Sequence, residues 1–210
     1  MGTLTERAVS RRGLIKAGSL LSMGLAVPKA FASVAAQPKI TGVKPELVSR
    51  AFAAMQKHQR SGVPTSVFAI ADFDEPSNKP RFHVIDMIAG KTRSYLVSHG
   101  RGSDPDHSGW LRRFSNQEGS YASSSGTYLT SELYVGKHGK SRRLVGLDPS
   151  NSNAEPRAIV IHSAWYVSDE MVRQHGKLGR SEGCFALDKA CLDEALTVLG
   201  PNRFIYADKI

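Results

Sequence analysis

The 210-residue chain has only two cysteines, Cys184 and Cys191, and it contains no long hydrophobic run. The modestly apolar stretch at residues 17–27 is too short, and too rich in glycine and serine, for a membrane span. Internal repeats and low-complexity domains are also absent from the sequence. These absences disfavour an integral membrane protein and a repeat protein, and they leave few candidates for thiol chemistry.

Acidic residues are scarcer than basic ones, with 19 against 28, and the formal net charge is +9. The basic residues are scattered and are not interleaved with aromatic runs, so we expect no nucleic-acid partner. The seven histidines have irregular spacing that matches no compact ligand motif, and we expect neither a metal nor another cofactor. A hydrophobic content of 40% is ordinary for a globular protein.

The N-terminus has the pattern of a twin-arginine export signal. The pair Arg11-Arg12 precedes the apolar stretch, and Ala30-Phe31-Ala32 fits a small-x-small cleavage site. We therefore expect a signal peptide over residues 1–32, with Ala36 as an alternative cleavage point; an uncleaved anchor or a disordered basic tail is the other interpretation. Cleavage after residue 32 would leave a 178-residue, monomeric periplasmic protein of net charge +5, without stable membrane insertion.

Hydrophobic periodicity predicts an N-terminal helical lead-in at residues 33–65 and one mainly β domain, a β-rich α+β fold, at residues 66–210. Residues 45–60 have a helical apolar stripe. Residues 99–126 have no sustained period, and a long irregular loop inside a compact domain is usually functional or mobile. Strands are expected at residues 66–71, 82–88, 92–98, 127–130, 144–147, 158–162 and 203–207, and further helices begin near Ser168 and Asp188.

Cys184 follows Gly183 in a short turn, and His162 ends an apolar strand in the same domain. A thiol that attacks a carbonyl needs a base and needs hydrogen-bond donors for the oxyanion. Glycine permits a turn in which the N–H groups of Gly183 and Cys184 face one point. Arg180 can hold a substrate carboxylate or favour the thiolate, whereas an inward Glu182 would oppose the thiolate. The residues alone leave open that Cys184 is an inert core cysteine.

The other candidate residues also have two interpretations. Cys191 lies beside an apolar helical stripe and suits a small buried hydrophobe, but a disulfide with Cys184 is conceivable and would silence the nucleophile. His162 can be a core histidine instead of a base. His99 opens the glycine-rich loop and can be a loop residue, a substrate contact or a metal ligand.

The chain resembles the YkuD-type murein L,D-transpeptidase catalytic domains. The motifs that carry the resemblance occur in order over most of residues 66–208. They are Val97-Ser98-His99-Gly100, Phe114-Ser115-Asn116, Ser123-Ser124-Ser125-Gly126-Thr127-Tyr128, Leu144-Val145-Gly146-Leu147, Ile159-Val160-Ile161-His162 and Gly179-Arg180-Ser181-Glu182-Gly183-Cys184.

The resemblance implies a β-sandwich of the L,D-transpeptidase type and an exported cysteine acyltransferase that acts on peptidoglycan stem peptides. Cys184 is then the nucleophile that forms a thioester, and His162 is the base. The N–H groups of Gly183 and Cys184 hold the oxyanion. The expected substrate contacts are Arg180, Ser181, His99 and Tyr166.

Two features depart from the commoner family motif. Glu182 replaces a second histidine directly before the Gly-Cys pair, and the interval from His162 to Ser181 is somewhat longer. Two other functions therefore remain as alternatives: an L,D-carboxypeptidase that delivers the thioester to water, and a non-catalytic wall-binding protein. The stem positions joined and the acceptor are left open by the sequence.

Overall fold

The computed structural model describes residues 40–59 and 62–210, which belong to one compact unit. The expected signal peptide at residues 1–32 lies outside the described residues. The boundary expected between residues 65 and 66 stays a prediction. None of the helices in the described part of the chain has the length and apolar character needed to cross a membrane.

The described elements confirm the predicted mainly β fold with a few short helices. Nine strands of the described region form one continuous sheet in the order β3-β2-β1-β9-β5-β6-β7-β8-β4. In chain order the elements are α1 (Pro45–His58), β1 (Val67–Asp72), β2 (Phe82–Asp86), β3 (Lys91–Tyr95), β4 (Val97–Ser98), η1 (Arg101–Ser103), β5 (Gly126–Gly136), β6 (Gly139–Gly146), β7 (Val160–Ser163), α2 (Asp169–His175), β8 (Phe185–Leu187), α3 (Lys189–Val198) and β9 (Phe204–Asp208).

Strand β1 is buried on both faces of the sheet, and it separates two parts of the core. Phe68 and Ile70 pack in a cluster with the apolar side chains of α1. Ala69 and Ala71 point the opposite way into a second cluster, which includes side chains of β5, β7, β8 and α3. Since successive side chains of a strand alternate between faces, an unbroken apolar run is what a doubly covered strand requires.

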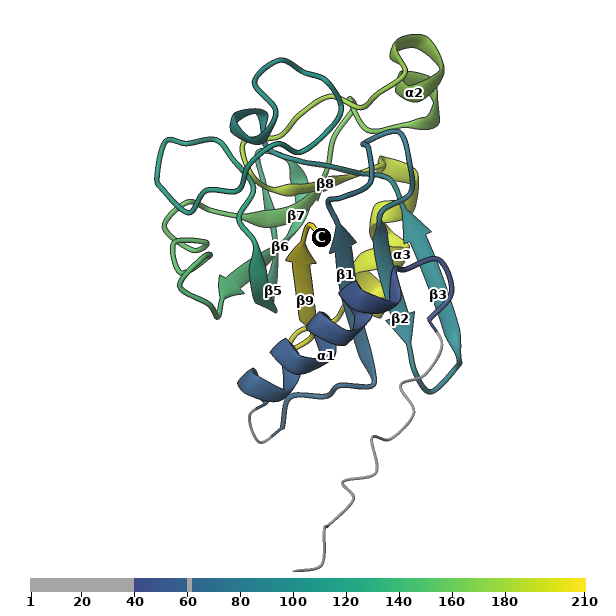
Figure 1. Cartoon of the computed structure of the whole chain (residues 1–210), viewed down its shortest axis with the longest axis vertical. Helices are drawn as coiled ribbons and strands as arrows, with labels where there is room; N and C mark the ends of the chain where they lie inside the picture. The colour runs from purple at the N-terminus through teal and green to yellow at the C-terminus, as the bar shows by residue number, and fades with distance from the viewer. Residues whose placement is uncertain (1–39, 60–61) are drawn as a thin grey trace, which may run out of the picture. The chain divides into compact units, whose positions relative to one another are not determined.

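Helix α1 lies across one face of the sheet, against β1, β9 and β5 (Figure 1). Its predicted stripe of Val48, Ala51, Phe52 and Met55 faces the sheet: all are buried except Phe52, which is half-buried, and Leu47 is buried with them. Pro45 stands at the first turn, where the missing N–H costs no intrahelical hydrogen bond. The helix expected from periodicity is thus confirmed, and it closes the core on that side.

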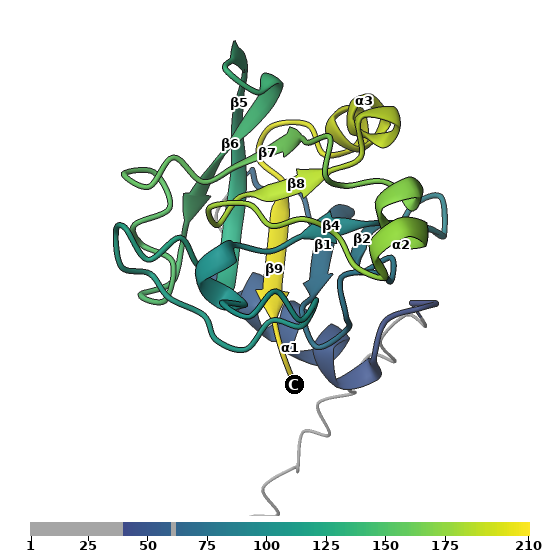
Figure 2. The same cartoon turned by 90° about the horizontal axis from the view of Figure 1, so that it is seen from above.

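The hairpin of β5 and β6 is longer than the sequence predicted. Apolar patterning indicated strands only at residues 127–130 and 144–147, yet the hairpin continues through residues 131–143 and projects beyond the rest of the sheet (Figure 2). Leu133 and Val135 are 46% and 82% exposed. Because this part buries little apolar surface, it lacks the one-sided patterning by which a strand is recognised.

Both predicted C-terminal helices are confirmed, with their predicted starts. The Ser168 hydroxyl accepts a hydrogen bond from the N–H of Met171, and the Asp188 carboxylate accepts one from the N–H of Ala190. Such caps satisfy backbone donors that a helix leaves unpaired. These helices flank the short strand β8, which the sequence analysis missed because it has only three residues.

We expect Leu47→Ala to lower the free energy of unfolding by about 2–5 kcal/mol, because it deletes a fully buried side chain between α1 and the sheet. The exposed Gln56→Ala on the same helix is the control and should change it by less than about 0.5 kcal/mol. Urea titration measures both variants. Equal effects would show that α1 does not pack on the sheet as described.

Candidate active site

The nucleophile candidate stands at a tight turn that leads directly into β8. Gly183 has φ +115°, a conformation that residues with a side chain rarely adopt. A Cβ at this position would lie 2.6 Å from the carbonyl oxygen of Ala122 and 2.9 Å from a guanidinium nitrogen of Arg157. Glycine is therefore required here both by backbone conformation and by space, and it fixes where Cys184 enters the strand.

The pairing of β7 with β8 brings Cys184 and His162 to one face of the sheet. The strands are parallel, and His162 pairs with Ala186. Cys184 is two residues before Ala186, so its side chain points to the same side as the imidazole. Both side chains line one cavity of about 440 Å³. The thiol and the base expected from the sequence are thus placed together.

The surroundings of His162 fix its tautomer. Its Nδ1 lies 2.8 Å from the carbonyl oxygen of Ser163. A carbonyl can only accept a hydrogen bond, so Nδ1 carries the proton and Nε2 is left as the basic nitrogen. Burial, opposed by this hydrogen bond, lowers the pKa of His162 to about 4. The imidazole is therefore neutral at neutral pH and able to accept a proton.

Cys184 is held as a protonated thiol. Its Sγ lies 3.6 Å from the carbonyl oxygen of Ala158, an acceptor. Burial raises the pKa of the thiol above its ordinary value, although the backbone at Val160 and the charge of Arg157 act in the opposite direction. Glu182 adds to the upward shift. The cavity thus contains a neutral thiol and a neutral imidazole, the protonation states from which general-base activation of a thiol starts.

Ser181 lies within the turn and holds its shape. Its hydroxyl donates to the carbonyl oxygen of Cys184 at 2.7 Å and accepts from the N–H of Gly183 at 3.2 Å. The Gly183 N–H, one of the two expected oxyanion donors, is therefore already engaged. It must exchange or share this bond to serve an oxyanion, and the assignment of Gly183 and Cys184 as oxyanion donors stays a prediction.

Two other expected substrate contacts, Arg180 and Tyr166, line the same cavity. The Tyr166 side chain packs over the backbone of Gly179, where a Cβ would come within 2.5 Å of the Tyr166 Cβ and 2.7 Å of its ring. Burial raises the pKa of Tyr166 to about 12, so the phenol stays protonated and can donate a hydrogen bond. The structure thus brings Cys184, His162, Ser181, Arg180 and Tyr166 together.

His99 is not among the side chains that line the cavity. It is fully buried, with Nδ1 2.8 Å from Arg81 and Nε2 3.3 Å from Asp104. Burial and the Arg81 charge lower the pKa of His99 to about 3. Its backbone carbonyl accepts from the N–H of Ser181 at 2.9 Å, so it supports the turn before Cys184 from outside the cavity.

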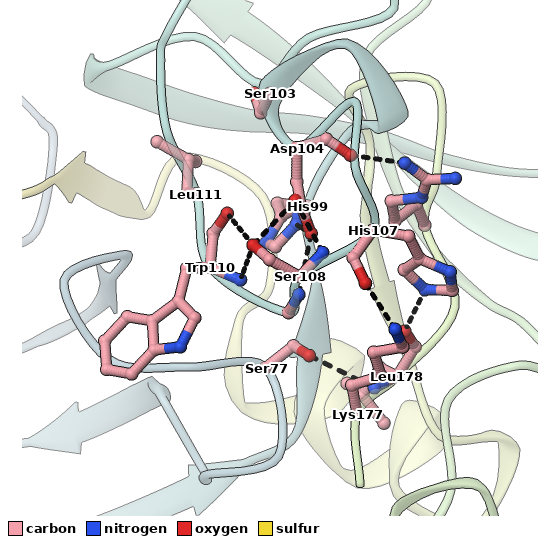
Figure 3. A network of polar contacts seen from close by, with 12 residues as sticks. Ser77, His99, Ser103, Asp104, His107, Ser108, Trp110, Leu111, Lys177 and Leu178 are labelled. Atoms are coloured by element: carbon pink, nitrogen blue, oxygen red, sulfur yellow. Dashed lines mark hydrogen bonds and ion pairs between the residues drawn. The ribbon is translucent and has the colours of Figure 1, made fainter. Parts of the chain in front are cut away.

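Figure 3 shows the polar network that surrounds His99. The Asp104 carboxylate accepts hydrogen bonds of 2.8 Å from the N–H groups of Ser108 and Gly109. Burial alone would raise the pKa of Asp104, but these bonds outweigh it and lower the pKa. On the other side of the network, the ring of His107 donates to the carbonyl oxygen of Leu178 at 2.8 Å. The network ties the loop after β4 to the segment that leads into the nucleophile turn.

Sequence reasoning missed several residues of the cavity wall. His138, at the tip of the β5–β6 hairpin, stacks on His162 with ring centroids 4.3 Å apart. Lys137 and Tyr134 of the same hairpin also line the cavity. Arg157 lies beside the turn and donates to the carbonyl oxygen of Ser115 at 2.9 Å. None of these stands in a recognisable motif, and only the unforeseen length of the hairpin brings its tip here.

Both cysteines are free thiols, and Cys191 lies in α3 outside the cavity that Cys184 lines. Within residues 40–59 and 62–210, no cluster of three or more histidine, cysteine or acidic side chains is arranged to hold a metal ion.

A family model described as the L,D-transpeptidase catalytic domain matches residues 39–207. The chain belongs to this family. No curated protein matches the sequence.

Solved structures with similarity to this L,D-transpeptidase family member are distant in sequence. An L,D-transpeptidase from Mycobacterium smegmatis is 15% identical, with a TM-score of 0.41 over 68% of this chain and 58% of that one. An L,D-transpeptidase from Xylanimonas cellulosilytica is 12% identical, with a TM-score of 0.43 over 76% and 69%. The helical cell shape determining protein Pgp2 from Campylobacter jejuni is 14% identical, with a TM-score of 0.40 over 80% and 57%. This chain thus spans less than two thirds of the length of the Mycobacterium and Campylobacter chains.

Within the L,D-transpeptidase motif, the unusual residue is Glu182. It lines the catalytic cavity, and its carboxylate pairs with Arg101 at 3.2 Å. The side chain is 62% exposed, so the pair is screened by water. Glu182 stands where the commoner form of the motif has a histidine, and its carboxylate is drawn toward Arg101.

We expect iodoacetamide to alkylate Cys184 more slowly than free cysteine at pH 7, with a rate that keeps rising above pH 8.5, the approximate pKa of a free thiol. The reason is that burial raises the pKa of Cys184 and so lowers its thiolate fraction. Mass spectrometry of a Cys191→Ser variant restricts the measurement to Cys184. A fast rate that is constant from pH 6 to 8 would instead indicate a preformed thiolate.

Proposed function

We propose that the chain is a cysteine L,D-transpeptidase that crosslinks peptidoglycan stem peptides. The observation that carries the proposal is the placement of Cys184 and His162 on one face of two adjacent parallel strands, in one cavity. Membership of the L,D-transpeptidase catalytic domain family supports the reaction class.

In the first half of the reaction, the Cys184 sulfur attacks the carbonyl carbon that precedes the terminal D-alanine of a donor stem. Nε2 of His162 takes the thiol proton as the carbon–sulfur bond forms. When the tetrahedral intermediate collapses, the carbon–nitrogen bond breaks and the imidazolium returns that proton to the departing amine. The products are free D-alanine and a thioester on Cys184.

In the second half, the amine of another stem attacks the thioester carbonyl. His162 takes a proton from that amine and delivers it to the leaving sulfur, so the thiol is restored and an amide crosslink remains. Water can replace the amine, and the enzyme is then a carboxypeptidase. Tyr166 and His138 beside His162 narrow the space through which an acceptor reaches the thioester.

Purified mature protein incubated with tetrapeptide muropeptides should release D-alanine and form dimers. Cys184→Ala should abolish both products, because the nucleophile is lost. His162→Ala should lower the rate by about 10²–10⁴-fold, as expected when a general base is removed. Chromatography with mass spectrometry measures the products, and Cys191→Ala, which removes the thiol outside the cavity, is the matched control.

The remaining outcomes of this assay separate the alternatives. Tripeptides without dimers would identify a carboxypeptidase. If a carbapenem adds its mass to Cys184, the alternative of a non-catalytic wall-binding protein is ruled out.

We also propose that the protein reaches the periplasm by the twin-arginine route, with residues 1–32 as the signal. The support is the Arg11-Arg12 pair ahead of the apolar stretch. In cell fractionation, Arg11→Lys combined with Arg12→Lys should leave most of the protein in the cytoplasm, whereas Arg7→Lys should be exported normally. Export of the double variant at the normal level would contradict this route.

A further inference from the structure

A second cavity adjoins the catalytic one, in the irregular region that follows β4. It has a volume of about 320 Å³ and we call it the arginine groove. Three of its lining side chains are cationic and none is acidic. The groove is lined by Arg101, Gly102, Pro105, Arg113, Tyr121 and Arg180.

Arg180 connects the two cavities, since it lines both the arginine groove and the cavity that contains Cys184. The catalytic cavity has two further cations, Lys137 and Arg157, and one acid, Glu182. A ligand that extends past Arg180 therefore passes from one positively charged region into another. Such a surface attracts anions and disfavours cations.

The backbone of Tyr121 is built to place its ring in this groove. Tyr121 has φ +54°, a left-handed conformation that is uncommon for a residue with a side chain. Its carbonyl oxygen accepts from the N–H of Gly102 at 2.9 Å, and a Cβ on Gly100 would lie 2.3 Å from that oxygen. The resulting orientation puts the ring under the Arg101 guanidinium, 3.7 Å from its centroid. Stacking of this kind restrains an arginine without using its N–H donors.

The other two arginines are oriented by backbone carbonyls. Nε of Arg113 donates to the carbonyl oxygen of Gly102 at 3.0 Å, and Nη1 of Arg180 donates to that of Pro105 at 3.1 Å. A guanidinium has five N–H donors, so each group keeps donors for a ligand. In the described residues neither arginine forms an ion pair, and neither positive charge is neutralised by a carboxylate.

Arg101 differs from them because it pairs with Glu182 across the rim of the groove. Both side chains are about half exposed or more, so the pair is weak and a ligand carboxylate can replace it. Glu182 therefore occupies, in the resting protein, one of the positions that a ligand carboxylate would take.

We propose that the arginine groove is a carboxylate-binding subsite that holds a second carboxylate of the peptide whose reacting carbonyl lies at Cys184. Planar arginine groups bind carboxylates in paired, parallel hydrogen bonds. The inference rests on the proposed function, because it takes the anionic peptide in the catalytic cavity as the substrate. It assigns the groove a role in substrate selection, and it gives Glu182 the role of a competing internal carboxylate.

The kinetic test compares two neighbouring arginines of equal charge. Arg113 lines the groove, whereas the exposed Arg112 does not. With a tetrapeptide whose side carboxylates are free, Arg113→Gln should raise KM by roughly three- to tenfold and leave kcat within about twofold, since one charged contact is lost. Arg112→Gln should not change KM. With the same tetrapeptide amidated at those carboxylates, Arg113→Gln and Arg112→Gln should have the same KM.

A binding measurement keeps this proposal separate from the proposed function. Calorimetry measures the affinity for the free and the amidated tetrapeptide. It is done on Cys184→Ala protein with and without Arg113→Gln, so it detects binding at the groove even if no turnover occurs. Tighter binding of the free peptide that depends on Arg113 supports the subsite. Turnover together with equal effects of Arg113→Gln and Arg112→Gln overturns it while the proposed function stands.

Binding of a phosphate compound tests which class of anion the groove prefers. Tripolyphosphate is the phosphate probe, and its binding without peptide binding would show a phosphate site and overturn the carboxylate assignment.

If loss of the Arg113–Gly102 contact unfolds the protein, as judged by circular dichroism, Arg101→Gln replaces Arg113→Gln in both measurements. The Arg101→Gln variant should weaken binding of the tetrapeptide with free carboxylates by the factor expected for Arg113→Gln.

Discussion

The parallel pairing of β7 with β8 is the constraint on which the proposed active site depends. His162 lies in β7 and Cys184 directly precedes β8, and the register decides whether their side chains share a face. A shift by one residue would turn either His162 or Cys184 to the opposite side of the sheet. The long β5–β6 hairpin then adds one wall of the cavity, and the irregular region after β4 lines the adjoining arginine groove. The strands thus fix the positions of Cys184 and His162, while the hairpin and the irregular region form the surrounding surfaces.

Buried charged side chains also support the turn that contains Cys184. Arg81, His99 and Asp104 are buried together, and each is hydrogen-bonded within the network. Removing one partner from such a network leaves another polar group unpaired, which costs more than an ordinary surface contact. Through the backbone of His99, this network supports Ser181 and hence the turn at Cys184. A histidine first considered as a substrate contact therefore lies one layer behind the cavity.

Patterns confined to a short stretch of sequence predicted the local structure well. The stripe of α1, the caps Ser168 and Asp188 and the buried strand before His162 depend on neighbouring residues, and all are present. Features set by distant contacts could not be predicted in this way. His138 stacks on His162 only because an exposed hairpin extends to it, and the groove at Arg101 and Arg113 exists only because Tyr121 packs against glycines of another segment.

Strand β9, Phe204–Asp208, is the last described strand in the chain, yet it lies in the interior of the sheet between β1 and β5. Until it is inserted, two inner edges of the sheet stay open and the core around Phe204 and Ile205 is incomplete. A chain in which β9 has not yet been inserted therefore cannot close its sheet, in whatever order its other strands pair. Open inner edges are also where unfinished chains associate, so the time before this strand is placed is when the protein most needs chaperone protection.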